Sequence, residues 1–187
     1  MEELRENLEQ IRFANPNIDH RHFIPEADLF AVVSESAVKL SLRNLAVPVH
    51  EIKDLTDSIL RGARKCFAIL VLIRRGEAIS GFFRGDSLQQ SNPDDRLPYA
   101  SETLQQIFGV EATSVTISSF LDMQSSIAIP ILRQHTIFRT LDKNVILPFL
   151  REEYAGEGSM GTVSKIELHP RCHQLPLENH KVSVHSN

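Results

Sequence analysis

The chain has 187 residues, of which 42% are hydrophobic, so it is long enough for one ordinary domain with a packed core. Its formal net charge is −4, it contains no tryptophan, and its aromatic content is 6%. This balance argues against nucleic acid as a partner, because it provides neither a basic patch nor a platform of aromatic side chains on which bases stack.

Targeting signals are not recognisable in the sequence. Residues 1–6 are acidic and lack the apolar core of a signal peptide. The longest apolar run, Cys66 to Ile73, is much shorter than the roughly 20 residues that cross a bilayer. Cys66 and Cys172 are expected to be unpaired thiols in a reducing compartment. We therefore expect a cytoplasmic or nuclear protein that is neither secreted nor held in a membrane.

The first helices of the chain are expected to be short. Apolar residues recur at helical spacing over residues 2–13, which predicts an amphipathic helix that ends before Asn15-Pro16-Asn17. A second helix is predicted to begin near Pro25 and a third over residues 37–45. The exposed faces of these helices are where a protein partner would bind.

The strongest helical pattern begins at Pro48 and predicts one continuous helix to Ile73. Its last residues are apolar on all sides, so this end should be buried on every side. Arg74, Arg75 and Gly76 follow, which is the favourable composition for a helix C-terminus. The apolar stripe consists of Ile52, Leu55, Ile59, Ala63, Cys66, Leu70 and Ile73.

Weaker patterns continue the helical body. Residues 78–83 predict one or two more helical turns, and residues 86–101 a long polar loop in which Asp94 and Asp95 are ordinary solvated charges. Helices are predicted over residues 101–108, capped by Ser101 with Glu102 and ended by Gly109, and from about residue 118 to 127. A last short helix, through Val145 and Ile146, would be capped by Asp142.

The character of the sequence then changes, because residues 156–163 follow the pattern G-x-G-x-x-G-x-V. Glycines at this spacing allow a turn whose free N–H groups cradle phosphate oxygens. A dinucleotide-binding fold requires a helix to start at the glycines, inside a βαβ unit. Residues 162–168 instead alternate as a strand does, which favours the hairpin that forms the nucleotide loop of protein kinases.

Residues 146–170, ILPFLREEYAGEGSMGTVSKIELHP, resemble the start of the kinase domain in a group of fungal serine/threonine protein kinases. Those proteins also carry a helical region upstream, with an apolar helix similar to residues 66–73 here. The resemblance implies ATP as the cofactor: the three glycines would lie over its phosphates, and Val163 against the adenine ring. The residues so implied are Gly156, Gly158, Ser159, Met160, Gly161 and Val163. Ala155 and Met160 depart from the larger aliphatic and the aromatic residue that are common at these two positions.

The catalytic motifs of a kinase are missing from the sequence. No H-R-D-L-x-x-x-N, D-F-G or A-P-E occurs in the 187 residues. Lys181 precedes its apolar neighbours instead of following them, and Lys165 belongs to the second strand of the hairpin, so neither fits the lysine of V-A-I-K. We assign no catalytic residue and expect a truncated kinase-like protein that is inactive alone. The alternative is a helical interaction or regulatory module with a vestigial hairpin.

The predicted fold class is therefore mainly α. A helical accessory domain over residues 1–140 precedes a hairpin over 146–168, which resembles the first two strands of a kinase N-lobe, and a disordered tail over 169–187. Histidines and Cys172 crowd this tail, but their spacing fits no closed zinc site, and no metal is predicted. No Ser–His or Cys–His nucleophile is predicted either.

Overall fold

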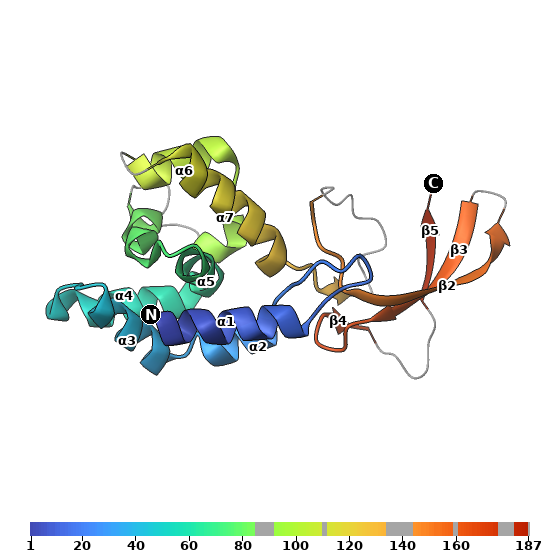
Figure 1. Cartoon of the computed structure of the whole chain (residues 1–187), viewed down its shortest axis with the longest axis horizontal. Helices are drawn as coiled ribbons and strands as arrows, with labels where there is room; N and C mark the ends of the chain where they lie inside the picture. Colours follow the sequence, from blue (N-terminus) through green and yellow to red (C-terminus); the bar gives the residue numbers. More distant parts are fainter. Residues whose placement is uncertain (85–91, 110–111, 134–143, 159–160, 176–181, 187) are drawn as a thin grey trace.

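The computed structural model describes residues 1–84, 92–109, 112–133, 144–158, 161–175 and 182–186. The prediction of a mainly α fold is confirmed: a helical body occupies one end of an elongated molecule and a small antiparallel sheet the other (Figure 1). None of the helices in these ranges is long and apolar enough to cross a lipid bilayer. The elements are α1 (Glu2–Ala14), α2 (Glu26–Val32), α3 (Glu35–Asn44), α4 (Val49–Gly62), α5 (Arg64–Leu72), η1 (Gly76–Phe83), η2 (Pro93–Arg96), α6 (Ser101–Phe108), α7 (Ser114–Ile127), β1 (Leu132–Arg133), β2 (Phe149–Gly158), β3 (Gly161–Leu168), β4 (His173–Gln174) and β5 (Val182–Ser186).

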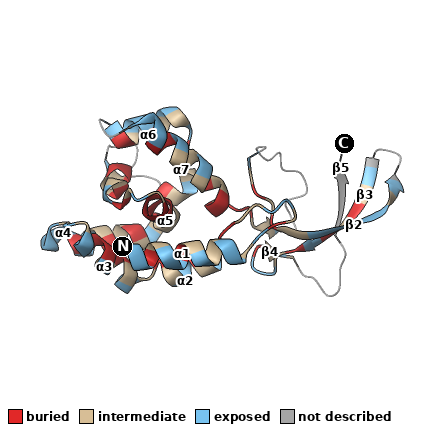
Figure 2. Ribbon diagram, viewed as in Figure 1, coloured by how far each residue is buried: buried red, intermediate tan, exposed pale blue. Residues whose placement is uncertain are grey.

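Helix α5 is the centre of the helical body. Every residue from Cys66 to Leu72 is buried, as the apolar run predicts, and Figure 2 shows this helix in red between its neighbours. Helices α1, α2, α4 and α7 and the 3₁₀ helix η1 all contact it. Ring contacts on the α6–α7 side extend this core and involve Phe82, Tyr99, Phe108 and Phe120.

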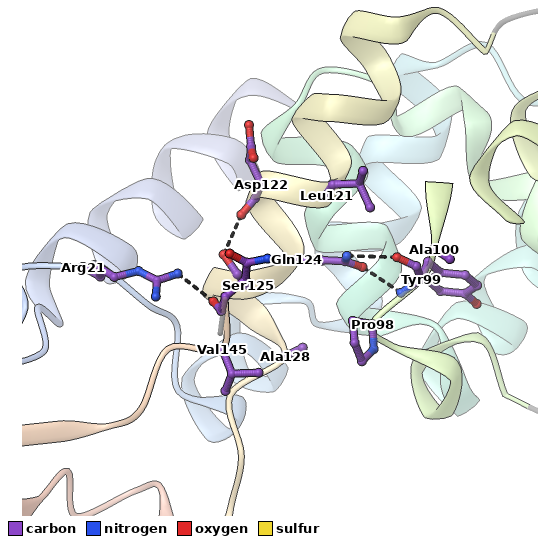
Figure 3. A pocket seen from close by; sticks show the side chains of 11 residues that line it. Arg21, Pro98, Tyr99, Ala100, Leu121, Asp122, Gln124, Ser125, Ala128 and Val145 are labelled. Carbon is purple, nitrogen blue, oxygen red and sulfur yellow. Dashed lines mark hydrogen bonds between the residues drawn. The ribbon is translucent and has the colours of Figure 1, made fainter. Parts of the chain in front are cut away.

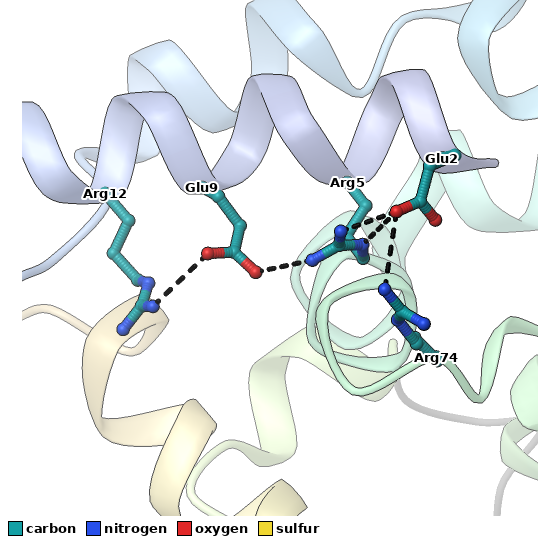
Figure 4. Close-up of polar contacts among 5 residues, drawn as sticks. All are labelled: Glu2, Arg5, Glu9, Arg12 and Arg74. Atoms are coloured by element: carbon teal, nitrogen blue, oxygen red, sulfur yellow. Dashed lines mark hydrogen bonds and ion pairs between the residues drawn. The ribbon is translucent and has the colours of Figure 1, made fainter.

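Helix α1 packs on this core through Leu4 and Leu8, which are both buried. Its polar side carries a row of alternating charges (Figure 4). The Glu9 carboxylate lies 2.7 Å from Nη1 of Arg5 and 3.7 Å from Nη2 of Arg12. Arg74, just after α5, reaches Glu2 at 3.5 Å. Because these ion pairs are close to solvent, they orient α1 more than they stabilise it.

The predicted single helix over residues 48–73 is wrong, because the chain breaks at Ala63 into α4 and α5. The η2 segment crosses at this point: a Cβ on Gly62 would lie 2.3 Å from the Cβ of Asn92. Asp94 then accepts the N–H of Lys65 at 3.0 Å and of Cys66 at 2.9 Å. Asp94 is thus the N-terminal cap of α5, supplied by a distant segment, and the prediction that it is an ordinary solvated charge is wrong.

Other helix predictions differ in their boundaries. Residues 76–83 form a 3₁₀ helix, α6 begins at Ser101 without a side-chain cap, and α7 begins four residues before the predicted residue 118. The earlier start of α7 is due to Thr113, whose hydroxyl accepts the N–H of Thr116 at 3.1 Å. The helix predicted through residues 145–146 does not form; its cap, Asp142, lies outside the described residues.

The tail predicted to be disordered carries two strands. β5 pairs with β3, so the sheet has the order β2-β3-β5, and β4 pairs with β1 in parallel. Cys172 is 2% exposed and shares a second small core with Phe23, Ile129 and Ile146. Arg171 also forms an ion pair with Asp28 of α2. Contacts from the helical body thus hold the beginning of the tail in place.

Candidate functional site

The glycine pattern lies at the tip of the predicted hairpin. β2 and β3 pair as antiparallel strands up to Gly158, which is the partner of Gly161. Gly156 and Gly158 therefore end β2, while Gly161 and Val163 begin β3. Ser159 and Met160, which the resemblance assigns to the phosphates, lie outside the described residues.

The backbone of Gly156, near the tip of the hairpin, has a conformation that disfavours any side chain. Its φ is +152°, and the β2–β3 register shifts between Tyr154 and Gly156, so one additional residue bulges from β2 just before the tip. Apart from its two chain neighbours, no atom of the residues that the structure describes lies within 4 Å of an added Cβ at Gly156. Glycine is therefore needed here for its conformation and not for space.

The two faces of β3 differ. Ser164, Ile166 and Leu168 are buried, whereas Val163 and Lys165, on the opposite face, are half-buried. The ammonium of Lys165 lies 3.0 Å from the Glu153 carboxylate across the hairpin. The lysine nearest to Val163 along β3 is thus paired with a carboxylate, and Val163 presents a small apolar surface next to the glycines.

A third strand, β5, extends the glycine hairpin to a three-stranded antiparallel sheet. β5 lies antiparallel to β3, and His185 is the register partner of Val163. Sequence reasoning missed this strand because the segment before it has no periodicity. The alternation of Val182 and Val184 with polar residues was the signal that could have revealed it. Lys181, the lysine rejected for the V-A-I-K role, lies outside the described residues.

A second cluster of reactive side chains joins the helical body to the sheet. Nε2 of His169, after β3, lies 3.0 Å from Oδ1 of Asn15, after α1. The amide nitrogen of Asn15 donates to the Ile11 carbonyl, so Oδ1 is the acceptor and Nε2 of His169 carries the proton. Nδ1 of His169 then accepts the backbone N–H of Arg171 at 3.3 Å and lies 3.7 Å from Sγ of Cys172.

In this cluster a thiol lies next to an imidazole base, and an amide orients the imidazole from its other side. Cysteine nucleophiles in enzymes have the same arrangement. Burial prevents that chemistry: Cys172 is 2% exposed, and burial raises the pKa of its thiol to about 11. Burial and the nearby His173 lower the pKa of His169, so the imidazole is neutral and the thiol stays protonated. The cluster therefore serves to attach the sheet to α1. Among the described residues, no group of three or more His, Cys, Asp or Glu is placed to hold a metal ion.

Comparison with known proteins adds no relative: none of the family models, curated proteins or solved structures with which the chain was compared matches it.

Proposed function

We propose that the chain couples a helical domain to the first strands of a protein-kinase-like N-lobe, whose glycine hairpin is a loop for nucleotide phosphates. The observation that carries this proposal is the hairpin itself: β2 and β3 pair up to Gly158 and Gly161, so the pattern G-x-G-x-x-G spans the turn between two strands. A dinucleotide-binding loop would instead lead into a helix.

The third strand also supports this proposal. Its first four residues are Val182-Ser183-Val184-His185, and it follows the hairpin in the sheet, as the V-A-I-K strand follows the glycine loop in kinases. His185 stands at the fourth position of this motif, where kinases have the lysine that pairs with the α- and β-phosphates. ATP would then be held mainly by backbone N–H groups, and we expect weak binding.

We expect no phosphoryl transfer by these residues. Transfer requires metal ligands and a base that orients the hydroxyl nucleophile, and the motifs that supply them in kinases do not occur in the 187 residues. The glycine hairpin would therefore act by binding nucleotide and not by using it.

MgATP titration of the full chain, followed by NMR, tests this function with Gly156→Ala and a matched control. Gly109 is the control position, because it also has a positive φ, +56°, and open space around it, but it ends α6. We expect shifts in the hairpin that saturate for the unmodified chain and for Gly109→Ala, with weaker binding by Gly156→Ala. Absence of binding, or equal binding by all three, would remove the nucleotide role of the hairpin.

A second function, a helical protein-interaction module, is favoured by a different observation. Among the residues whose burial the structure describes, the main core draws its buried residues from positions 4–127 and includes none from β2 or β3. Leu40 on α3 remains 46% exposed and is a candidate contact for a protein partner. Pull-down with the full chain would compare Leu40→Glu with Val115→Glu, which alters a 72% exposed residue at the start of α7. Loss of captured partner with Leu40→Glu alone supports this function, while loss with Gly156→Ala would assign partner binding to the hairpin.

A further inference from the structure

A cavity of about 650 Å³ opens where the helical body meets the segment leading into β2 (Figure 3). Its walls come from three parts of the chain: α7 and the residue after it, the segment 98–100 before α6, and residues 144–145 before β2. Arg21 closes one side. The volume falls in the range of about 300–1,000 Å³ that is usual for small-molecule sites.

Hydrogen bonds hold two of these walls in place. Gln124 of α7 is 7% exposed and accepts the N–H of Tyr99 at 2.9 Å, while its own amide donates to the Tyr99 carbonyl at 3.1 Å. The Tyr99 hydroxyl donates to the Pro93 carbonyl at 2.9 Å. Both the N–H and the carbonyl of Tyr99 are thus bonded to the Gln124 side chain of α7. The wall formed by residues 98–100 is therefore held in place by these hydrogen bonds.

The third wall is held from the N-terminal segment. Nη2 of Arg21 donates to the carbonyl of Asn144 at 2.7 Å, and the Asn17 amide donates to the carbonyl of Leu147 at 3.2 Å. Figure 3 shows the Arg21 guanidinium reaching across toward this wall. The same side chain therefore shapes the cavity and faces its contents.

The chemistry of the lining is amphiphilic. Pro98, Leu121, Ala128 and Val145 provide an apolar surface. Arg21 is the one cationic side chain among the described residues that line the cavity, and only one of its N–H groups has an acceptor in the part of the chain that the structure describes. Arg21 is half-buried as a residue, although the hydrogen bond of its guanidinium is exposed. A guanidinium with free donors is suited to a carboxylate, which it binds through two parallel hydrogen bonds.

Asp122 is the one carboxylate among these lining residues, and its position limits its effect. It lies on the exposed side of α7, and Figure 3 shows its carboxylate directed away from Arg21. Solvent therefore screens its repulsion of an anion bound at Arg21. A dianionic phosphate would experience twice this repulsion without a second cation in the lining, so a monocarboxylate fits better.

We propose that this cavity binds a small amphiphilic monocarboxylate, with the carboxylate on Arg21 and the apolar body against Pro98, Leu121 and Val145. The site is separate from the glycine hairpin and does not rest on nucleotide binding. Its ligand would contact both the helical body and the segment that leads into the sheet.

Octanoate is the probe for this proposal. Acetate, which lacks the long alkyl chain, and 1-octanol, which lacks the carboxylate, are the matched control ligands. Titration of the full chain, followed by NMR, should give saturable shifts at residues lining the cavity for octanoate. We expect acetate and octanol to bind at least about tenfold more weakly, since each loses either the apolar contact or the charged hydrogen bonds.

Two variants test whether the carboxylate of octanoate binds at Arg21. Arg21→Gln should weaken octanoate binding by about tenfold or more, because hydrogen bonds to a charged group are lost. Arg43→Gln removes the same charge from an exposed position on α3 and should leave binding unchanged. Thermal unfolding checks that both variants fold. Octanoate shifts outside the cavity, equal binding of octanoate and octanol, or unchanged binding by folded Arg21→Gln would overturn the proposal.

Discussion

Replacement of Asp94 tests whether a segment 29 residues away in sequence caps the central helix. The carboxylate of Asp94 accepts the N–H groups of Lys65 and Cys66, which are the second and third residues of α5. In an ordinary N-terminus these donors are satisfied by the residue just before the helix, but here that residue is Ala63, which has no acceptor in its side chain. Asp94→Ala leaves both donors without this partner.

The expected cost follows from the surroundings of the carboxylate. Loss of a capping side chain costs about 0.5–2 kcal/mol, and a buried donor left unsatisfied costs about 1–3 kcal/mol. A cavity of about 260 Å³ lined by Asp94 and Lys65 admits water, which partly replaces the lost acceptor. We therefore expect Asp94→Ala to lower the free energy of unfolding by about 2 kcal/mol, at the top of the capping range. Asp94→Asn keeps only one of the two acceptor oxygens, because its amide nitrogen replaces the oxygen that accepts the other N–H. It should therefore cost about 1 kcal/mol, less than Asp94→Ala.

The pH dependence gives a second readout. Burial raises the pKa of Asp94 above its ordinary 3.8, although the N–H groups of Lys65 and Cys66 oppose the shift. The folded state therefore holds this proton more tightly than the unfolded state. The stability of the unmodified chain relative to Asp94→Asn should be greatest below pH 3.8 and should fall as the pH rises through the folded pKa.

Urea unfolding followed by circular dichroism measures both effects, provided that the slope m stays constant among the variants. Asp95→Ala is the matched control, because Asp95 is exposed and lies on the same 3₁₀ helix. If Asp94→Ala unfolds at the same urea concentration as Asp95→Ala, Asp94 does not cap α5 and the reasoning fails.

Three further predictions concern packing and the junction. Leu70→Ala, in the centre of α5, should destabilise by about 2–5 kcal/mol in urea unfolding, whereas Leu40→Ala on the exposed face of α3 should cost little; equal costs would contradict the described core. Gly62→Ala should destabilise by about 1–3 kcal/mol despite the better helix propensity of alanine, because its methyl group overlaps Asn92; a stabilised variant would mean that η2 does not cross there. His169 has a pKa below 6.5 in the folded state, so stability should fall as the pH drops below 6.5 until the folded pKa of His169 is passed. His169→Gln should remove this part of the pH dependence, and an identical pH profile would contradict a half-buried neutral imidazole.

Hydrophobic periodicity was sufficient to predict those elements whose start and end depend on residues of the same helix or hairpin. The apolar spacing over residues 2–13 corresponds to α1, and the fully apolar run after Cys66 is buried as expected. The break at Ala63 was not readable, because the stripe continues through it without interruption. Its causes are Asn92 and Asp94, which approach from a crossing segment that has no marker in the sequence of α4 or α5.

In the candidate site, too, the features that depend on local sequence could be predicted and those that depend on distant contacts could not. The hairpin could be predicted because glycine spacing and strand alternation are local signals, and β2 and β3 confirm it. The contact between Asn15 and His169 could not, since it joins residues 154 positions apart. Composition suggested disorder for the tail, but the burial of Cys172 against Phe23 offsets the cost of ordering its first residues.

The two unpaired thiols lie one in each core, Cys66 in the helical body and Cys172 at the junction with the sheet. Burial raises the pKa of both, so an alkylating reagent in excess would modify each thiol only when its own core opens. Mass spectrometry of the two labelled peptides would therefore time the opening of the two cores separately in a single sample of unaltered protein. A faster rate at Cys172 would mean that the sheet detaches from a helical body that is still folded.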